Sequence, residues 1–278
     1  MPDSPKKPGP GEGSAAEGHL PAQLITTQLG WEDLVLSPEV LDEVEMIIAW
    51  LRHSQQIMDG WGLGRALKPG YRCLFHGPPG TGKTLTATLI ASRVGVDVYR
   101  IDLSRVVSKY IGETEKNLAN VFDRAEDKNW ILYFDEADAL FGKRTEVSSS
   151  HDRYANQEIS YLLQRVENFR GLVILSTNLR DNIDPALARR FQSVIHFPLP
   201  DAEQRLRLWA GCVDRGCPLA NDVDLSELAA EYDLSGDGIL NVVRYGAIRA
   251  LRDARQSIRR DDLLEGIRKE FRKEGRAV

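Results

Sequence analysis

The stretch "GPPGTGKT" at residues 77–84 matches the pattern GxxxxGK[ST]. It follows "YRCLFH" at residues 71–76, a largely apolar run that is typical of a buried strand. Glycines in such a loop let successive backbone N–H groups turn inward as a nest for an anion, and a helix that begins near Lys83 points its positive end at the same place. The stretch therefore predicts a phosphate-binding loop between a strand and a helix of an α/β protein.

Individual residues of this loop have expected parts in holding a nucleotide. Lys83 would reach the β- and γ-phosphates, and the Thr84 hydroxyl would bind Mg²⁺. The alternative interpretation is a Gly-Pro turn that carries a surface lysine. The residues expected to bind the cofactor here are Gly77, Pro78, Pro79, Gly80, Thr81, Gly82, Lys83, Thr84 and Leu85.

A second motif, "ILYFDEADALFG" at residues 131–142, runs apolar residues straight into two carboxylates. A phosphate-binding loop needs an acidic group at another strand end to hold Mg²⁺, and a base for the attacking water. We expect Asp135 to hold the metal and Glu136 to accept the proton of the water. Taken alone, such a pair is more often the start of a helix, where carboxylates suit the helix dipole. Beside the loop at 77–84, catalysis is the better interpretation.

The rest of the chain predicts a three-layer α/β domain followed by helices. Further apolar runs at residues 96–101, 130–134, 172–176 and 193–197 alternate with helical patterns, as in a parallel sheet covered on both faces. A helix is expected from Pro38 to His53, with Ser37 as its N-cap. After "PLPD" at 198–201 the strand signals stop, and helices are expected near residues 201–214, 224–231, 237–252 and 260–272. The predicted division is a disordered tail or linker at 1–20, a large α/β domain at 21–199 and a small helical domain at 200–278.

Composition excludes several classes of protein. The net charge of −5 gives no general attraction to nucleic acid or to an anionic membrane. The basic excess at 244–276 is interpreted as salt-bridged helix faces, with docking of an acidic partner or of nucleic acid as the alternative. The apolar runs are all shorter than the 18 residues of a membrane span, so membrane insertion is not expected. The three cysteines show no metal-ligand spacing, which favours reduced thiols in a cytoplasmic protein.

Together the motifs resemble those of the AAA+ ATPases, close to the classical branch and to its single-module bacterial members. The likeness runs from about Trp31 to the last predicted helix: 77–84 resembles Walker A, 131–140 Walker B, "LSTN" at 175–178 sensor 1, and "NIDPALARRF…HFPLPD" the second region of homology. The resemblance implies a P-loop NTPase fold with a five-stranded parallel sheet in the order 5-1-4-3-2 and a small all-α lid. It also implies hydrolysis of ATP with Mg²⁺.

The resemblance assigns further roles around the phosphate site. Asn178 would orient the attacking water beside Glu136, and Arg189 and Arg190 would be arginine fingers that reach the γ-phosphate of a neighbouring subunit. Fingers supplied in this way require a ring, which this family usually closes with six subunits. The adenine would lie between Leu34 and Val35 of "WEDLVL" on one side and Gly236 and Asp237 of "LSGDGILNVV" on the other, without a sensor-2 arginine.

The resemblance also places a pore loop in "SKYIGETEKNL" at residues 108–118, formed by Lys109, Tyr110, Ile111 and Gly112. Six such tyrosines would grip an extended protein client in the axial channel of a ring. The alternative is that Tyr110 packs onto its own sheet. The predicted function is a ring motor that unfolds, threads or disassembles protein clients, and the competing hypothesis is a nucleotide-dependent assembly switch that does not thread. A P-loop kinase or GTPase fits badly, since the chain has no NKxD signature.

Overall fold

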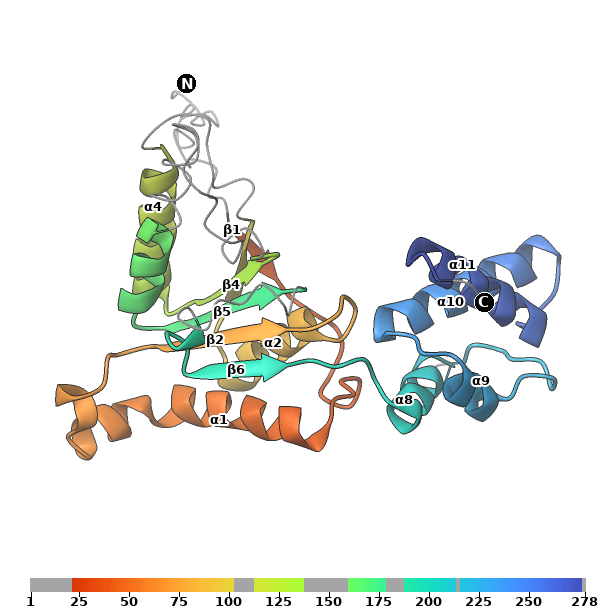
Figure 1. The fold of residues 1–278 in the computed structure, drawn as a ribbon, viewed down its shortest axis with the longest axis horizontal. Coiled ribbons are helices and arrows are strands. Elements are labelled where there is room, and N and C mark those ends of the chain that lie inside the picture. The colour runs from red at the N-terminus through yellow and green to blue at the C-terminus, as the bar shows by residue number, and fades with distance from the viewer. Residues whose placement is uncertain (1–21, 103–112, 138–159, 179–187, 214–215, 277–278) are drawn as a thin grey trace, which may run out of the picture.

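The computed structural model describes residues 22–102, 113–137, 160–178, 188–213 and 216–276. The described part contains one mixed sheet with helices on both faces, and a helical unit beyond the last strand (Figure 1). None of the described helices combines the length and the apolar character that a bilayer crossing requires. The strands of the sheet are β1 (Ala22–Ile25), β2 (Tyr71–His76), β3 (Val98–Asp102), β4 (Ile131–Asp135), β5 (Leu172–Thr177) and β6 (Ser193–His196).

The sheet has the spatial order β1-β3-β4-β5-β2-β6. The strands from β2 to β6 run parallel, and with β2 counted as the first of them their order is 5-1-4-3-2, as the resemblance implied. β1 adds a sixth strand that the sequence did not predict. It pairs antiparallel with β3, from Ala22 opposite Ile101 to Ile25 opposite Val98. The four residues "AQLI" have no buried side chain, so backbone pairing at the sheet edge, and not an apolar pattern, forms this strand.

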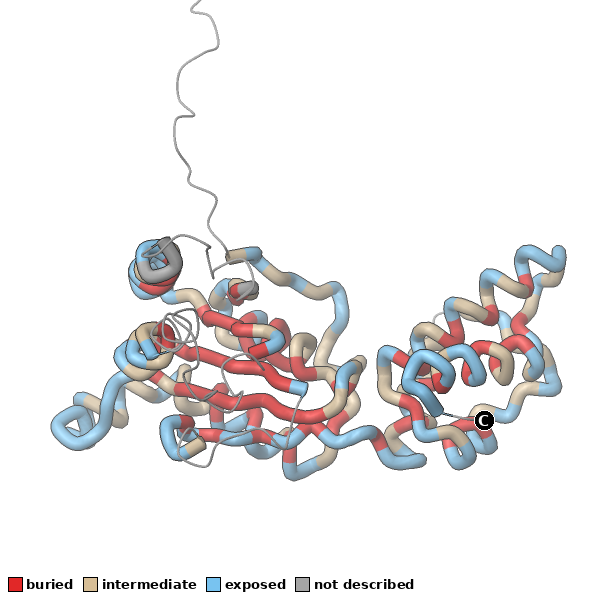
Figure 2. The backbone as a smooth tube through the Cα atoms, turned by 45° about the horizontal axis from the view of Figure 1, so that its top comes forward, coloured by how far each residue is buried: buried red, intermediate tan, exposed pale blue. Residues whose placement is uncertain are grey.

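Two layers of helices cover the sheet and bury its side chains from opposite faces. On one face lie α1 (Pro38–Gln55) and α2 (Lys83–Val94), and on the other lie α4 (Glu113–Lys128) and helical residues 160–168. The backbone is buried along the middle strands and exposed on the outer sides of the helices (Figure 2). This is the three-layer α/β arrangement that the apolar runs predicted.

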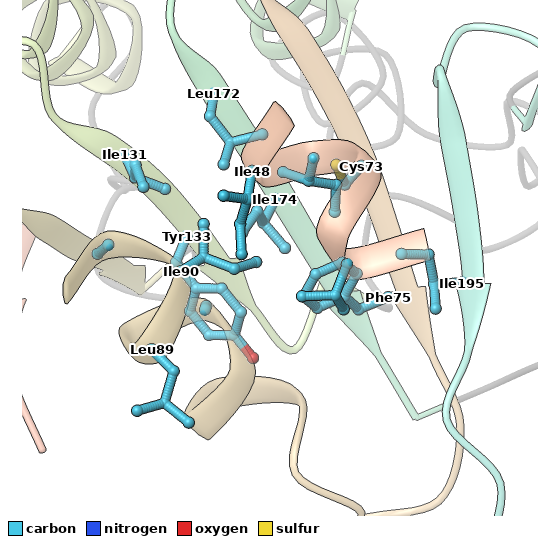
Figure 3. Close-up of a cluster of buried hydrophobic side chains, with 14 of the residues drawn as sticks. Ile48, Cys73, Phe75, Leu89, Ile90, Ile131, Tyr133, Leu172, Ile174 and Ile195 are labelled. Atoms are coloured by element: carbon cyan, nitrogen blue, oxygen red, sulfur yellow. The ribbon is translucent and has the colours of Figure 1, made fainter. Parts of the chain in front are cut away.

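The cluster beneath α1 and α2 shows how side chains from separate segments fill one face of the sheet (Figure 3). Ile48 of α1 and Ile90 of α2 meet Phe75 and Ile174 from the strands, and each of these four is at most 1% exposed. Tyr133 of β4 lies in the same apolar cluster, although its ring carries a hydroxyl group. A hydroxyl in such surroundings is costly unless it has a hydrogen-bond partner.

The helix predicted at 38–53 is α1, and its start follows the predicted chemistry. Ser37 is the N-cap, and its Oγ accepts a hydrogen bond from the Val40 N–H at 3.4 Å, while Pro38 occupies the first helical position. The helix continues into a π-helical turn, η1 (Gln56–Gly60), and a short 3₁₀ turn, η2 (Leu63–Arg65).

Beyond β6 the chain forms four helices around their own core. They are α8 (Ala202–Val213), α9 (Leu225–Glu231), α10 (Gly236–Arg252) and α11 (Arg260–Lys273), and they lie where the sequence predicted helices. Their buried cluster includes the fully buried Trp209 and contains residues from this part of the chain alone. We call these helices the lid. The division of the chain at residue 199 stays a prediction.

A short linker joins the sheet to the lid and is fixed at both ends. Phe197 is fully buried under the sheet, and its N–H donates to the His76 carbonyl at 2.7 Å. Arg205 of α8 is 6% exposed and donates to the carbonyls of Pro200 and Ala229, both at 2.7 Å. The segment between Phe197 and Pro200 therefore passes beside the end of β2, where the loop at 77–84 begins.

Asp262 is the carboxylate that joins α10 to α11 in the lid. It is 2% exposed, its two oxygens accept hydrogen bonds from Arg255 at 2.6 and 3.0 Å, and Arg249 lies 3.1 Å away. Removing one partner of a buried ion pair leaves an uncompensated charge, so Asp262→Ala should lower the free energy of unfolding by about 3 kcal/mol. Chemical denaturation measures the loss. The exposed neighbour Asp261 is the control, and an equal loss in Asp261→Ala would contradict the assignment.

The same carboxylate makes the stability of the lid depend on pH. The hydrogen bonds from Arg255 are the main reason that the pKa of Asp262 is lowered. Because the folded pKa lies below the unfolded value of about 3.9, the stabilisation is complete at neutral pH and is lost as the pH falls below about 4. The difference in unfolding free energy between the wild type and Asp262→Asn should therefore shrink through that range.

Candidate active site

The loop at 77–84 is held in a conformation that requires glycine. Gly77 has φ +145°, and an added Cβ would overlap the Phe197 carbonyl oxygen behind it. Gly80 has φ +73°, and an added Cβ would lie 2.7 Å from Ser235 Oγ and 2.8 Å from Asp237 Cβ of the lid. The loop is thus fixed between the exit of β6 on one side and the start of α10 on the other.

Lys83 stands at the first position of α2, with its ammonium group folded back over the loop. The side chain is 7% exposed, and Nζ donates to the carbonyls of Gly77 and Pro78, both at 2.8 Å. Thr81 Oγ1 donates to the same Pro78 carbonyl at 2.9 Å. These bonds place a positive charge and the N-terminus of α2 at the mouth of the loop, as anion binding requires.

The carboxylate of Asp135 lies at the end of β4, opposite the start of α2. Its Oδ1 accepts the Glu136 N–H at 3.1 Å and the Tyr133 hydroxyl at 3.4 Å, and its Oδ2 lies 3.0 Å from a guanidinium nitrogen of Arg100. The Tyr133 hydroxyl also lies 3.0 Å from Thr84 Oγ1. One hydroxyl therefore joins the two residues that the sequence predicted as magnesium ligands. Burial and the nearby Asp135 charge raise the pKa of Tyr133, so the phenol stays protonated.

Glu136 has an unusual backbone and an accessible side chain. Its φ is +51°, a left-handed backbone conformation that residues other than Gly, Asn and Asp rarely adopt. Its side chain is exposed. The next residue, Ala137, is buried and donates its N–H to the Ser176 carbonyl at 2.8 Å. The bend turns Glu136 out of the sheet while the backbone on either side stays fixed. Such local strain is frequent at functional sites.

A pocket of about 710 Å³ brings the predicted site residues together, and its volume is in the range of small-molecule sites. Five parts of the chain contribute: the loop, the segment before α1, the ends of β4 and β5, the linker after β6, and the lid. The predicted residues in its wall are Leu34, Val35, Pro79, Gly80, Thr81, Gly82, Lys83, Thr84, Leu85, Asp135, Glu136, Asn178, Gly236 and Asp237. Gly77 and Pro78, also predicted, do not line it; their carbonyls hold Lys83 instead.

Arg189 and Arg190 lie near the amino ends of the parallel strands, on the side of the sheet opposite the pocket. They precede β6, where the N–H of Gln192 donates to the Arg72 carbonyl at the start of β2. Both arginines are exposed, and Arg190 pairs with Glu167. From Arg72 to Gly77 a strand advances about 16 Å. The two arginines therefore cannot be part of the pocket wall of their own chain.

Four predicted residues cannot be placed. Lys109, Tyr110, Ile111 and Gly112 lie outside the described residues, so the pore loop stays a prediction.

The sequence reasoning missed the contribution of α8 to the pocket. Gln204, Arg207, Leu208, Gly211 and Cys212 line it. Their spacing of three and four residues is that of one face of a helix, so the periodicity held a signal that was not used. Tyr133 and Arg100 were missed as well, because their contact with Asp135 depends on the register between β3 and β4.

Comparison with known proteins identifies the family. Residues 73–199 match the family model described as ATPase family associated with various cellular activities (AAA). The chain belongs to the AAA family. This membership agrees with the resemblance of the Walker motifs and supports nucleotide binding in the pocket.

Several curated relatives of this AAA protein are 32% to 36% identical to it. A proteasome-activating nucleotidase of Aeropyrum pernix is 36% identical over 73% of this chain and 51% of that protein. The ATP-dependent zinc metalloprotease FtsH 2 of Sphaerobacter thermophilus is 34% identical over 85% of this chain and 36% of its own length. The probable 26S proteasome regulatory subunit 6B of Caenorhabditis elegans is 32% identical over 85% and 57%. The chain thus spans about half, or less, of the length of these relatives.

The exposed carboxylate of Glu136 gives a direct test of the site. Glu136→Gln should retain binding of ATP, because Lys83, Thr84 and Asp135 remain, and should lose most hydrolysis because the base is gone. Lys83→Ala should lose binding as well. Fluorescent-nucleotide binding and phosphate release measure the two properties. Glu126→Gln on the exposed side of α4 is the control, and near-normal turnover in Glu136→Gln would exclude Glu136 as the base.

Proposed function

We propose that this chain is the ATP-hydrolysing subunit of a ring that remodels, unfolds or disassembles protein clients. The observation that carries the proposal is the pocket, in which the phosphate loop, the two carboxylates and the lid meet. In this proposal the α/β domain ends at residue 199 and the lid follows it. The buried or half-buried free cysteines fit a cytoplasmic protein.

The phosphates of ATP would lie in the loop, against Lys83 and the N-terminus of α2. Thr84 and Asp135 would hold Mg²⁺. Both side chains carry the oxygen ligands that this ion prefers, and both contact the same Tyr133 hydroxyl, so they lie close together. When bound, the metal neutralises charge on the phosphates. The described residues contain no cluster of three or more His, Cys, Asp or Glu that could hold a metal alone, which agrees with a site completed by phosphate oxygens.

Glu136 would accept the proton of the attacking water, and Asn178 would orient that water. Both line the pocket, and both are exposed to it from the ends of neighbouring strands. On the far side, Leu34 and Val35 would face the adenine, with Gly236 and Asp237 of the lid opposite. Leu208 of α8 gives this end of the pocket an additional apolar wall.

The position of Arg189 and Arg190 supports a ring. The pocket lies at the carboxyl ends of the parallel strands, whereas the arginines precede β6 at the amino ends. An arginine finger at that edge can serve only the pocket of another subunit. A head-to-tail contact of this kind uses two different surfaces and closes into a ring when the rotation permits. We propose six subunits, as is usual in the family.

Protein clients are proposed from the relatives and from the predicted pore loop. The names of two relatives include the word proteasome, and the third relative is named a metalloprotease. Lys109, Tyr110, Ile111 and Gly112 would form the gripping surface in the axial channel. The alternative is an assembly switch that changes its partners without threading them.

The ring is tested by the arginines. Arg189→Ala with Arg190→Ala should retain ATP binding and lose hydrolysis by about 10³- to 10⁵-fold. Mixing this variant with Glu136→Gln should restore part of the activity, because a pocket with its own glutamate would then meet a neighbour with intact fingers. Arg170→Ala, an exposed arginine that precedes β5, is the control. Phosphate release that stays absent in every mixture would argue against fingers supplied by a neighbour.

Threading is tested at Tyr110. If the side chain projects into a channel, Tyr110→Ala should leave ring assembly, melting temperature and basal hydrolysis nearly intact. In Tyr110→Ala the stimulation of hydrolysis by a fused unstructured peptide should disappear. Tyr110→Phe should retain the stimulation, because the aromatic side chain still provides a flat surface. A tyrosine packed in a core would instead cost a few kcal/mol of stability. Full stimulation in an intact Tyr110→Ala ring would favour the assembly switch.

A further inference from the structure

The carboxylate of Asp135 has two neighbours, Tyr133 and Arg100, whose roles the proposed function does not explain. Arg100 of β3 is the direct register partner of Tyr133 of β4. Paired residues point to the same face of a sheet, and Asp135, two residues after Tyr133, points there as well. All three side chains therefore face α2, which begins with Lys83 and Thr84.

The Tyr133 hydroxyl is the more buried of the two neighbours. Its ring is fully buried in the cluster beneath α1 and α2, where phenylalanine would fill the same space (Figure 3). The hydroxyl therefore adds little to the packing. It contacts Thr84 Oγ1 at 3.0 Å and Asp135 Oδ1 at 3.4 Å, and it thereby connects the start of α2 with the end of β4. A buried hydroxyl with partners on two elements restricts the rotamers of both partners.

Arg100 acts on the same carboxylate through its charge. A guanidinium nitrogen lies 3.0 Å from Asp135 Oδ2, the oxygen that Tyr133 and the Glu136 N–H leave open. The Asp135 side chain is 20% exposed and the Arg100 side chain 43%, so the pair is partly screened by water. A positive charge at this distance still opposes the binding of a second cation to the same carboxylate.

We propose that Tyr133 is a positioning residue that aligns Thr84 and Asp135 for the metal of the bound nucleotide, and that Arg100 is a counter-charge that competes with the metal for Asp135. The proposal rests on the proposed binding of Mg²⁺ with nucleotide. It assigns opposite effects to the two side chains. Loss of the Tyr133 hydroxyl weakens the response of nucleotide binding to Mg²⁺, and loss of the Arg100 charge strengthens it.

The experiment measures binding of a fluorescent ADP analogue to the full chain over a series of Mg²⁺ concentrations, with EDTA as the metal-free condition. Tyr133→Phe should raise the Mg²⁺ concentration at half effect by about three- to tenfold, as expected for one lost hydrogen bond. Arg100→Gln should lower it by about two- to fivefold, as expected for a partly exposed pair. In both variants the affinity measured in EDTA and the melting temperature should remain close to the wild-type values.

Two matched variants control for the substitutions themselves. Tyr99→Phe removes a hydroxyl from β3, where the Tyr99 ring stacks on Trp130 with 3.8 Å between the ring centroids. Arg93→Gln removes an arginine of similar exposure that pairs with Glu45 at 3.3 Å. Neither residue lines the pocket, so neither variant should move the Mg²⁺ midpoint.

Each of the other possible results contradicts a named part of the inference. A wild type whose affinity is independent of Mg²⁺ would overturn the inference together with the proposed metal. A wild type that depends on Mg²⁺, with an unchanged midpoint in Tyr133→Phe, would overturn the positioning role alone. A lowered melting temperature with an unchanged midpoint would show that the hydroxyl serves only stability. A raised midpoint in Arg100→Gln would overturn the competition.

Discussion

The left-handed backbone of the phosphate loop is the constraint on which the site depends. Gly77 needs its conformation because the Phe197 carbonyl lies directly behind it, and Gly80 needs its own because the start of α10 lies against it. The first contact joins the loop to the sheet, and the second joins it to the lid. The loop that is proposed to hold the phosphates therefore contacts the sheet and the lid at once. In the proposed function, a bound nucleotide would favour the lid position that keeps this contact, since a ligand shifts conformations that differ in their contacts with it.

The parallel sheet then determines what a single subunit can and cannot do. The carboxyl ends of all strands from β2 to β6 lie on the same side of the sheet. The loop, Asp135 and Asn178 follow three of these strands and therefore lie close together. The same geometry places residues that precede a strand at the opposite edge, where Arg189 and Arg190 lie. If Arg189 or Arg190 is an arginine finger, as proposed, this separation across the sheet requires a second subunit.

Much of this arrangement could be predicted from the sequence, because it depends on local patterns. The apolar run at 71–76, the Ser37 cap and the helical spacing of the lid each depend on residues within one segment, and each agrees with the structure. β1 was missed because it depends on pairing with β3, about 75 residues along the chain, and "AQLI" has no apolar alternation of its own. The contact of Arg100 and Tyr133 with Asp135 was missed for the same reason, since the register between β3 and β4 decides which side chains meet. The roles of the site residues stay predictions.

A shared feature of the charged groups explains how such a site can be stable before nucleotide binds. Lys83 donates to the Gly77 and Pro78 carbonyls, Asp135 pairs with Arg100, and Arg190 pairs with Glu167. A charge that is largely buried without a partner would cost several kcal/mol, so Lys83 in particular needs those two carbonyls. Glu136 is exposed, and water solvates it instead. In the proposed function, binding of nucleotide would exchange one set of partners for another. The net affinity would then be the difference between the two sets, and the internal partners would pair with the charges again after product release.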